Sequence, residues 1–304
     1  MNTQIAELEG LIEGFIDRYK PSPLWVPVSG GKDSAAVWGL VSRVTSDYAV
    51  VYIQIPGQTH MDNVRSVLET ARILGVKSQR TVRVDKTRLI REKLESALRE
   101  CQRPCLLRVV AFDTHGRDFW AAMSQYGFPA PLGRFGRGTR WCCGVFKHRV
   151  LQRLPYNGCR NGRPWKYGVN GVKATDSPYR RKRYTSHEQT WEKTRDTYLF
   201  PLLNLTDKQV WQLLDRLNLT RAVAPQYNAW GRSPNCMWCP LIGKTRAART
   251  AQAIPPGMRA LITRHLLGLR DRYKEGTYSR EKIDQWLQIL SVPEAKHSPH
   301  QASQ

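Results

Sequence analysis

The sequence has no apolar run that approaches the ~18 residues that a membrane-spanning helix requires. Acidic residues are also scarce: 25 Asp and Glu stand against 48 Lys and Arg in 304 residues, a formal net charge of +23. This imbalance favours a polyanionic partner, because each neutralised phosphate releases condensed counterions. We therefore expect no membrane segment and a nucleic-acid partner; a basic surface that serves only solubility is the alternative.

A secretory signal, with its basic start and apolar core, is also missing from the opening residues. Residues 1–20 instead carry apolar side chains at helical spacing between acidic ones, at Ile5, Leu8, Leu11, Ile12, Phe15 and Ile16. We expect an N-terminal helix here and a soluble, cytoplasmic protein. In that reducing compartment, the seven cysteines are better read as ligands or reactive thiols than as a disulfide framework.

Internal repeats are absent, but apolar strands alternate with amphipathic helices. Strands are expected at 24–28, 48–55, 80–84 and 166–172, with helices at 33–44, 61–75, 85–100 and 144–154. This alternation predicts an α/β fold, a parallel twisted sheet flanked by helices with a nucleotide at the C-terminal edge of its strands.

The C-terminal part of the sequence has a different pattern. Thr206 is expected to cap a helix over 207–219, and further helices are expected at 257–274 and 279–290. The polar tail, with His297 and His300, is expected to be disordered. We therefore divide the chain into an N-terminal helix (1–20), a main domain (21–243) and a smaller helical C-terminal region (244–304).

One short segment lies between the first strand and the first internal helix: Ser29-Gly30-Gly31-Lys32-Asp33-Ser34. It lacks the spacing of a Walker phosphate loop. Its paired glycines nevertheless let backbone N–H groups close on an anion at a helix N-terminus, with Lys32 adding charge and the two serines donating hydrogen bonds. Asp33 would be repelled by bare phosphate and is expected to hold Mg²⁺ or to orient the turn. The segment predicts a nucleotide phosphate site; a plain tight turn is the alternative.

Four cysteines form two close pairs, Cys142-Cys143 and Cys236-x-x-Cys239. Four thiolates suit zinc or an iron–sulfur cluster. Adjacent cysteines fit structural zinc poorly, because its usual loops separate the ligands, whereas a cluster accepts neighbours at separate corners. A zinc site and a redox-active pair remain alternatives. The other cysteines are expected to be buried or incidental: Cys101, Cys105 and Cys159.

Four motifs in order carry a family resemblance. SGGKDS resembles the PP-loop of ATP pyrophosphatases, and TRWCCGVFKHRVL (139–151) with SPNCMWCPL (233–241) resembles the two segments that hold a 4Fe-4S cluster in sulfonucleotide reductases. GVKATDS (171–177) resembles their Gly-x-Arg-x-x-Glu-Ser signature, with Lys173 and Asp176 as substitutions, and YLFPLLNLTDKQVWQLL (198–214) resembles their Pro-Leu to Asp-Val-Trp run. The sequence is thus similar to the phosphoadenosine phosphosulfate (PAPS) reductase family of PP-loop proteins over residues 24 to about 243.

The resemblance implies ATP, or PAPS or adenylyl sulfate (APS), together with Mg²⁺ and a 4Fe-4S cluster. Lys32 would balance the β and γ phosphates, Asp33 would assist, and Lys173 would neutralise charge near the α phosphate. The implied nucleotide-binding residues are Ser29, Gly30, Gly31, Lys32, Asp33, Ser34, Gly57, Lys173, Asp176 and Ser177. The implied cluster ligands are Cys142, Cys143, Cys236 and Cys239.

One departure from the family pattern weakens a reductase assignment. Reductases of this family attack sulfur with a thiolate on a C-terminal tail, and no cysteine follows Cys239. A reductase would have to use Cys101, Cys105 or Cys159 instead.

The charge instead favours a nucleic-acid substrate. Similar proteins include DNA phosphorothioation sulfurtransferases, and other PP-loop enzymes thiolate tRNA. Both need a surface for a polyanion, which the run Arg180-Arg181-Lys182-Arg183 would supply. This run lies in a strongly basic segment, 177–189, that we expect to form a loop. The aromatic residues near it are candidates for stacking on bases: Tyr179, Tyr184 and Trp191.

The sequence therefore predicts an ATP-dependent sulfurtransferase that adenylates tRNA or DNA, releases pyrophosphate and inserts sulfur. Its sulfur would come from a donor such as a cysteine desulfurase or sulfide, and a homodimer is compatible with the sequence. A PAPS or APS reductase is the first alternative, and a non-catalytic nucleic-acid-binding protein on the same scaffold is the second.

Overall fold

The computed structural model describes residues 2–20, 24–129, 141–156, 166–191, 196–239 and 242–291. These residues contain a seven-stranded sheet in the order β3-β4-β2-β1-β5-β7-β6. The strands are β1 (Leu24–Val28), β2 (Tyr48–Gln54), β3 (Ser78–Val84), β4 (Cys105–Ala111), β5 (Tyr167–Val169), β6 (Glu188–Trp191) and β7 (Asp196–Leu199). Neighbouring strands are parallel, except that β6 runs antiparallel to β7 at one edge. The predicted α/β fold with a largely parallel sheet is confirmed.

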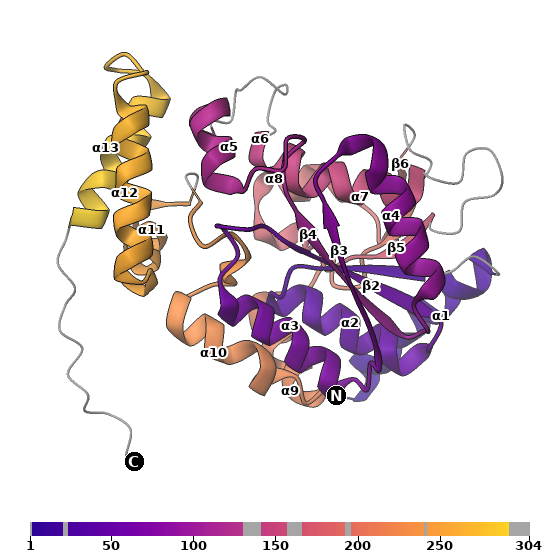
Figure 1. Ribbon diagram of the computed structural model, residues 1–304. Coiled ribbons are helices and arrows are strands. Elements are labelled where there is room, and N and C mark those ends of the chain that lie inside the picture. The colour runs from indigo at the N-terminus through magenta and orange to yellow at the C-terminus, as the bar shows by residue number, and fades with distance from the viewer. Residues whose placement is uncertain are drawn as a thin grey trace.

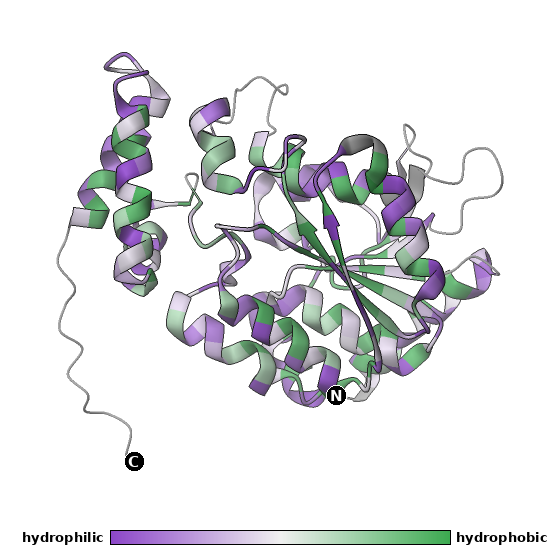
Figure 2. Ribbon diagram, in the orientation of Figure 1, coloured by the Kyte–Doolittle hydropathy of each residue, from purple (hydrophilic) through white to green (hydrophobic). Residues whose placement is uncertain are grey.

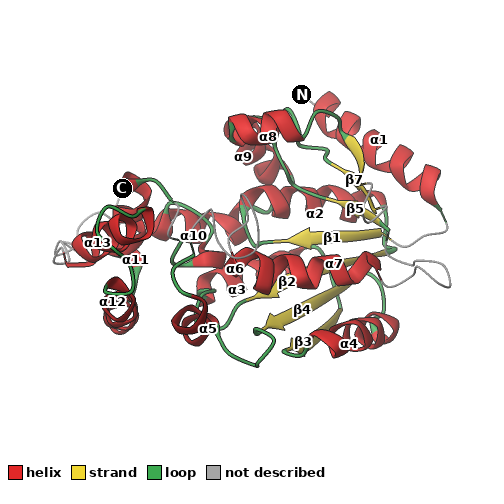
Figure 3. Ribbon diagram, turned by 90° about the horizontal axis from the view of Figure 1, so that it is seen from above, coloured by secondary structure: helices red, strands yellow, loops and turns green. Residues whose placement is uncertain are grey.

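Helices cover both faces of this sheet (Figure 1). One face carries α1 (Asn2–Tyr19), α2 (Lys32–Val44), α3 (Met61–Ile73), α9 (Asp207–Arg216) and α10 (Thr220–Trp230). The other face carries α4 (Thr87–Glu100), α5 (Phe119–Tyr126), α6 (Trp141–Cys143) and α7 (Arg149–Tyr156), with the π-helical turn η1 (Gly144–His148) between the last two. Figure 3 shows α7 and α4 in front of the strands.

The continuous apolar runs of the central strands follow from this arrangement. Along β1 and β2, alternate side chains enter the two cores: Trp25 and Val51 enter one, and Val26 and Val50 the other. Strands buried on both faces need apolar residues at every position, rather than at every second one. Figure 2 shows the same concentration of hydrophobic residues in the central strands.

The C-terminal helices lie beyond one end of the sheet (Figures 1 and 3). They are α11 (Lys244–Ala253), α12 (Pro256–Arg270) and α13 (Tyr278–Ser291). Their buried residues, among them Ile262 and Trp286, belong to the same hydrophobic core as Trp120 and Trp238 of the main domain. Across the described part of the chain, no helix combines the length and apolar character needed to cross a lipid bilayer.

One local prediction was wrong. The basic segment after Ser177 was read as a loop, but it forms a short helix, α8 (Pro178–Arg183). The Ser177 hydroxyl accepts a hydrogen bond from the Arg180 backbone N–H at 3.2 Å, and Pro178 occupies the first turn. Both are standard helix-start features, so the cap offsets the repulsion between the basic side chains. The sequence reasoning also missed β4, β6, α5, α10 and α11.

Candidate active site

The glycine turn joins the end of β1 to the start of α2 and is held in one shape by its own atoms. Gly30 has φ +72°, and a Cβ atom there would lie 2.3 Å from the Asn63 side-chain nitrogen. The Ser34 hydroxyl accepts from the Ser29 backbone N–H at 3.1 Å and donates to the Gly31 carbonyl at 2.9 Å. Only glycine fits at position 30, and the turn is preformed at the N-terminus of a 13-residue helix.

Two buried amides that the sequence analysis missed support the turn from behind. Asn63 of α3 donates to the Ser29 carbonyl at 3.1 Å, and Gln226 of α10 donates to the Gly30 carbonyl. Both are essentially fully buried. Tyr227 accepts from the Lys32 backbone N–H at 3.1 Å, and burial raises its pKa to about 12, so its hydroxyl stays protonated. In the sequence, the signal that could have identified Asn63 and Gln226 is a polar residue on the buried face of each helix.

Two lysines and three carboxylates form an ion-pair group beside the turn. Lys32 Nζ lies 3.0 Å from Asp33 Oδ2 and 3.0 Å from Asp207 Oδ1. Lys173 Nζ lies 2.9 Å from Asp176 Oδ1 and 3.5 Å from Asp33 Oδ1, and it also contacts Asp207. The structure therefore brings together Lys32, Asp33, Lys173 and Asp176 as the sequence predicted, and it adds Asp207, the first residue of α9.

Two members of this ion-pair group, Lys173 and Asp207, have a shifted pKa, and both are held in their charged form. Burial lowers the pKa of Lys173, but its hydrogen bonds to Asp207 and Asp176 raise the pKa by more. Burial raises the pKa of Asp207, but hydrogen bonds from Lys173 and Lys32 lower it by more. The lysines can exchange these carboxylates for phosphate oxygens, and freed carboxylates are the ligands that Mg²⁺ prefers.

A cavity of about 250 Å³ opens next to the turn. The turn contributes Ser29, Asp33 and Ser34 to its lining, while Lys147 of η1 and Arg180 of α8 line other parts. The cavity thus touches the predicted phosphate loop, the segment that carries Cys142 and Cys143, and the basic helix.

The predicted cysteine ligands come from two segments that meet near this cavity. Cys142 and Cys143 end α6, while Cys236 ends the short 3-10 helix η3 (Pro234–Cys236) and Cys239 follows it. A hydrogen bond with Cys143, then burial, then the charges of Cys236 and Cys239 raise the pKa of Cys142. Lys147 Nζ donates to Cys236 Sγ at 3.1 Å. The pKa of Cys142 therefore responds to the other three thiols.

Hydrogen bonds to the backbone hold the second cysteine segment. The backbone carbonyl of Gln58 accepts a hydrogen bond from the Met237 N–H at 2.8 Å, and its side-chain Oε1 accepts one from the Trp238 N–H at 3.0 Å. Arg232 donates to the carbonyls of Cys236 and Met237, the latter at 3.2 Å. The loop between the two thiols is thus fixed by residues that the sequence analysis did not single out.

The four thiols fit an iron–sulfur cluster by donor type, and a lysine beside one sulfur suits a site that holds thiolates. Among the described residues, no three His, Cys, Asp or Glu side chains take an arrangement that could hold a single metal ion.

Other predicted site residues have more local roles. Gly57, at φ +78°, accepts a hydrogen bond from Trp120 Nε1 at 2.7 Å, and a Cβ there would lie 2.8 Å from that ring. Ser177 caps α8, and Arg180 pairs with Asp176. Of the predicted nucleotide-binding residues, only Ser29, Asp33 and Ser34 are among the cavity's lining residues; the others are not: Gly30, Gly31, Lys32, Gly57, Lys173, Asp176 and Ser177. The remaining basic residues of α8 are exposed: Arg181, Lys182 and Arg183.

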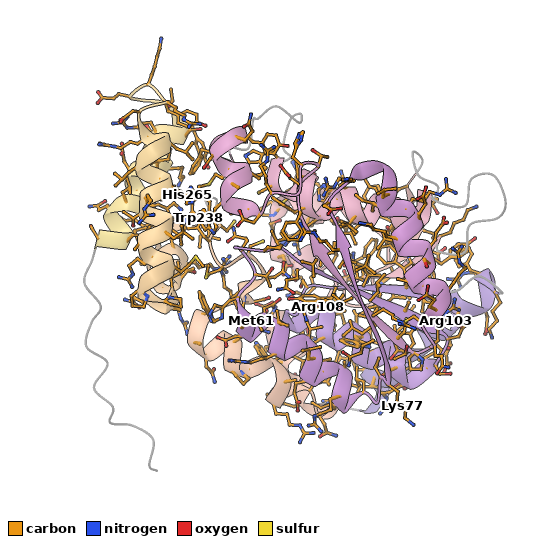
Figure 4. The ribbon with its side chains drawn as sticks, in the orientation of Figure 1. Met61, Lys77, Arg103, Arg108, Trp238 and His265 are labelled. Carbon is orange, nitrogen blue, oxygen red and sulfur yellow. The ribbon has the colours of Figure 1, made fainter. Side chains whose placement is uncertain are left out.

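Two of the three cysteines outside the predicted ligand set lie at the N-terminal end of the parallel strands. Cys101 and Cys105 are buried, as predicted, and Cys105 is the first residue of β4. The glycine turn follows the opposite, C-terminal end of the parallel strand β1. Figure 4 shows Arg103, between these cysteines, well away from Trp238 in the cysteine loop. The predictions for Cys159, His297 and His300 fall outside the described residues.

Comparisons with known proteins give one family. The phosphoadenosine phosphosulfate reductase domain matches residues 23–228, which include the turn and Lys173 but end before Cys236. Solved structures include a phosphoadenylyl-sulfate reductase from Candida auris in a phosphate complex, with 10% identity, TM-score 0.43, and coverage of 69% of this chain and 78% of that one. An NH3-dependent NAD synthetase from Campylobacter jejuni, in complex with nitrate, shares 11% identity at TM-score 0.44, covering 96% and 97%. No curated protein sequence matches the chain.

Proposed function

Because the chain belongs to the phosphoadenosine phosphosulfate reductase domain family, we propose that it is a PP-loop sulfurtransferase that adenylates nucleic acid and replaces the AMP with sulfur. The observation that carries this proposal is the cavity beside the turn. Its lining includes Ser29 and Ser34 of the phosphate loop, Lys147 in contact with Cys236, and Arg180 of the basic helix. One cavity thus touches the predicted phosphate loop, a lysine that contacts a cysteine sulfur, and a cation suited to a nucleic-acid backbone.

The chain's own residues account for nucleotide binding. The turn lies at the start of α2, where the helix dipole favours the negative charge of the ATP phosphates. Lys32 and Lys173 exchange their aspartate partners for phosphate oxygens of ATP. Asp33, Asp176 and Asp207 would then be able to hold Mg²⁺, which would supply positive charge to neutralise the phosphates.

The proposed reaction consists of two successive displacements. A nucleic-acid oxygen forms a bond to the α phosphorus, the bond from that phosphorus to the bridging oxygen breaks, and pyrophosphate leaves with the electron pair. A sulfide-equivalent donor then attacks the centre that bears the adenylated oxygen, and AMP leaves. Lys32 and Lys173 stabilise the negative charge that develops on the leaving groups.

A 4Fe-4S cluster would be held by Cys142, Cys143, Cys236 and Cys239 and would supply redox-active iron and bridging sulfide beside the nucleotide cavity. With one cysteine on each iron, the transferred sulfur would come from a separate donor. Lys147 stays beside Cys236 and presents its positive charge both to the sulfurs and to the cavity. Iron and sulfide analysis of anaerobically purified protein tests this part of the proposal, because it needs no turnover.

The family match also favours a second candidate, sulfonucleotide reduction. This reaction needs a thiol nucleophile, but Cys101 and Cys105 are buried at the N-terminal end of the parallel strands, at the opposite end from the glycine turn. Only Cys159, outside the described residues, is left for that role. Sulfite release from PAPS or APS that is lost in Cys159→Ala would favour this candidate over sulfur transfer.

The deciding experiment measures AMP and pyrophosphate release from ATP by anaerobically prepared protein, with and without bulk tRNA or duplex DNA. We expect release that one polymer stimulates and that Lys32→Ala abolishes. Lys282→Ala, on α13, is the matched control and should retain full release. Nucleic-acid binding without any release would favour a non-catalytic binding protein, and the absence of both would contradict the proposal.

A further inference from the structure

A second, larger cavity lies beside the nucleotide site and is lined by aromatic side chains. Its volume is about 750 Å³, within the range of sites that enclose a small organic group. We name it the aromatic pocket, after its lining residues Trp25, Tyr184, Trp191, Tyr198 and Phe200.

The rings of this pocket form one connected set. Tyr198 stacks on Phe200 with an interplanar angle of 17° and meets Trp25 edge-on at 5.7 Å between centroids. Tyr184 meets Phe200 at 5.1 Å and Trp191 at 6.2 Å, both edge-on. Trp25 and Phe200 are almost completely buried, whereas Tyr184, Trp191 and Tyr198 are partly exposed and can contact a planar aromatic guest.

Polar groups are placed around the rings. The Arg183 guanidinium lies 4.4 Å from the centroid of the Trp191 ring, and Asp196 contributes a buried carboxylate. Asn170 and Thr190 also line the pocket and can donate or accept hydrogen bonds. A guest with an apolar face and a polar edge fits this lining, and a carboxylate acceptor suits an amino group on that edge.

A positively charged helix contributes to the pocket. Arg183 belongs to α8, whose Arg181 and Lys182 are also exposed, and Tyr179 on the same helix is 68% exposed. Cations interleaved with an exposed aromatic ring are typical of surfaces that bind the backbone and bases of single-stranded nucleic acid.

The aromatic pocket adjoins the nucleotide cavity. Pro27, Leu151 and Asn170 line both. A base held in the aromatic pocket therefore brings its own atoms, and the sugar and phosphate attached to it, next to the expected position of the α phosphate of ATP.

From these contacts we propose that the aromatic pocket binds an unpaired base of the acceptor nucleic acid, an inference that rests on the proposed nucleic-acid substrate. A base inside a duplex cannot enter, so the acceptor nucleotide must be single-stranded, bulged or rotated out of the helix. Fully paired duplex is then held only through its phosphates.

The test uses two duplexes that differ only at one bulged position, which carries either an adenine or an abasic sugar. Fluorescence anisotropy at one fixed salt concentration gives the affinity of the full-length protein for each, without ATP. We expect the adenine bulge to bind about tenfold more tightly, since stacking on aromatic residues is the main added interaction. Equal affinity of the two probes would overturn the proposal, and this comparison needs no variant.

Variants then assign the preference to the pocket. Trp191→Ala and, independently, Tyr184→Leu should abolish the preference while leaving abasic-duplex binding nearly unchanged. Tyr278→Ala is the matched control, because Tyr278 also carries a cation over its ring, Lys282 at 5.9 Å, but lies on α13. A preference that survives Trp191→Ala in folded protein would place the base elsewhere and overturn the assignment.

The result is separable from catalysis, because the binding assay contains no ATP and no sulfur donor. A preference for the base without AMP release would support the pocket assignment and contradict the sulfurtransferase proposal. AMP release stimulated by polymer, without a preference for the base, would support the sulfurtransferase proposal and contradict the pocket assignment.

Discussion

Lys147 donates a hydrogen bond to the sulfur of Cys236 at 3.1 Å, across 89 positions of sequence. The same lysine lines the cavity that Ser29 and Asp33 border. Burial lowers the pKa of Lys147, but the neighbouring sulfurs of Cys236 and Cys143 raise it by more, so it is held as a cation. A positive charge thus stands between a phosphate loop and a thiol group, where it can balance anions on either side.

Removing the Lys32 charge should weaken nucleotide binding. In Lys32→Ala, Asp33 and Asp207 lose a shared cation and repel phosphate, so we expect ATP affinity to fall by about tenfold or more. Isothermal titration calorimetry with wild type, Lys32→Ala and the surface control Lys282→Ala measures this. Unchanged affinity in Lys32→Ala would place the nucleotide outside the turn.

Alanine substitutions at two glycines, Gly30 in the turn and Gly75 outside it, distinguish the cost of backbone strain from the cost of a steric clash. Gly75→Ala introduces a side chain at φ +68° with no atom within 4 Å, so it should cost about 1 kcal/mol of unfolding free energy. Gly30→Ala meets the same φ penalty and the Asn63 amide at 2.3 Å, so we expect about 3 kcal/mol. Chemical denaturation compares the two variants, and equal losses would mean that Asn63 moves aside without cost.

The turn was predictable from sequence because its whole signal is local: an apolar strand, two glycines, a lysine and a helix follow one another. Its supports were not. Asn63, Gln226 and Asp207 come from three different helices, and only packing of α3, α10 and α9 on one sheet face brings them to the turn.

The basic helix shows a different limit of sequence reasoning. Ser177 and Pro178 are helix-start residues, but the four like charges at 180–183 favoured a loop. The Arg180–Asp176 ion pair and the Ser177 cap, both visible only in three dimensions, outweigh that repulsion.

Asp113 should make stability depend on pH at the acid end. Its carboxylate is fully buried and accepts from the backbone N–H groups of His115 and Arg117, both at 2.9 Å, and from Arg117 Nε at 2.8 Å. Burial raises its pKa, but these hydrogen bonds lower it by more, so the folded-state pKa lies below the unfolded value. The unfolded chain therefore binds the proton more readily, and the stabilisation is present above the unfolded pKa and lost as pH falls through the folded one.

The matching measurement follows the unfolding free energy of wild type and Asp113→Asn from neutral pH down to about pH 3. Asp113→Asn should be less stable near neutrality, and the gap between the two proteins should narrow below about pH 4. A gap that stays constant with pH would show that the carboxylate charge contributes nothing to folding.

The cysteine group leads to a prediction about bound iron. If Cys142, Cys143, Cys236 and Cys239 hold a 4Fe-4S cluster, anaerobically purified protein should contain about four iron and four sulfide per chain, with broad visible absorbance. Cys236→Ser should lose most of both, because it removes a ligand and the partner of Lys147. Cys101→Ala is the matched control: this thiol is buried at the other edge of the sheet, so its removal should leave the iron content unchanged. One zinc per chain and no sulfide would instead identify a structural metal site, and the sulfur in the proposed reaction would then have to reach the nucleotide cavity directly from a donor.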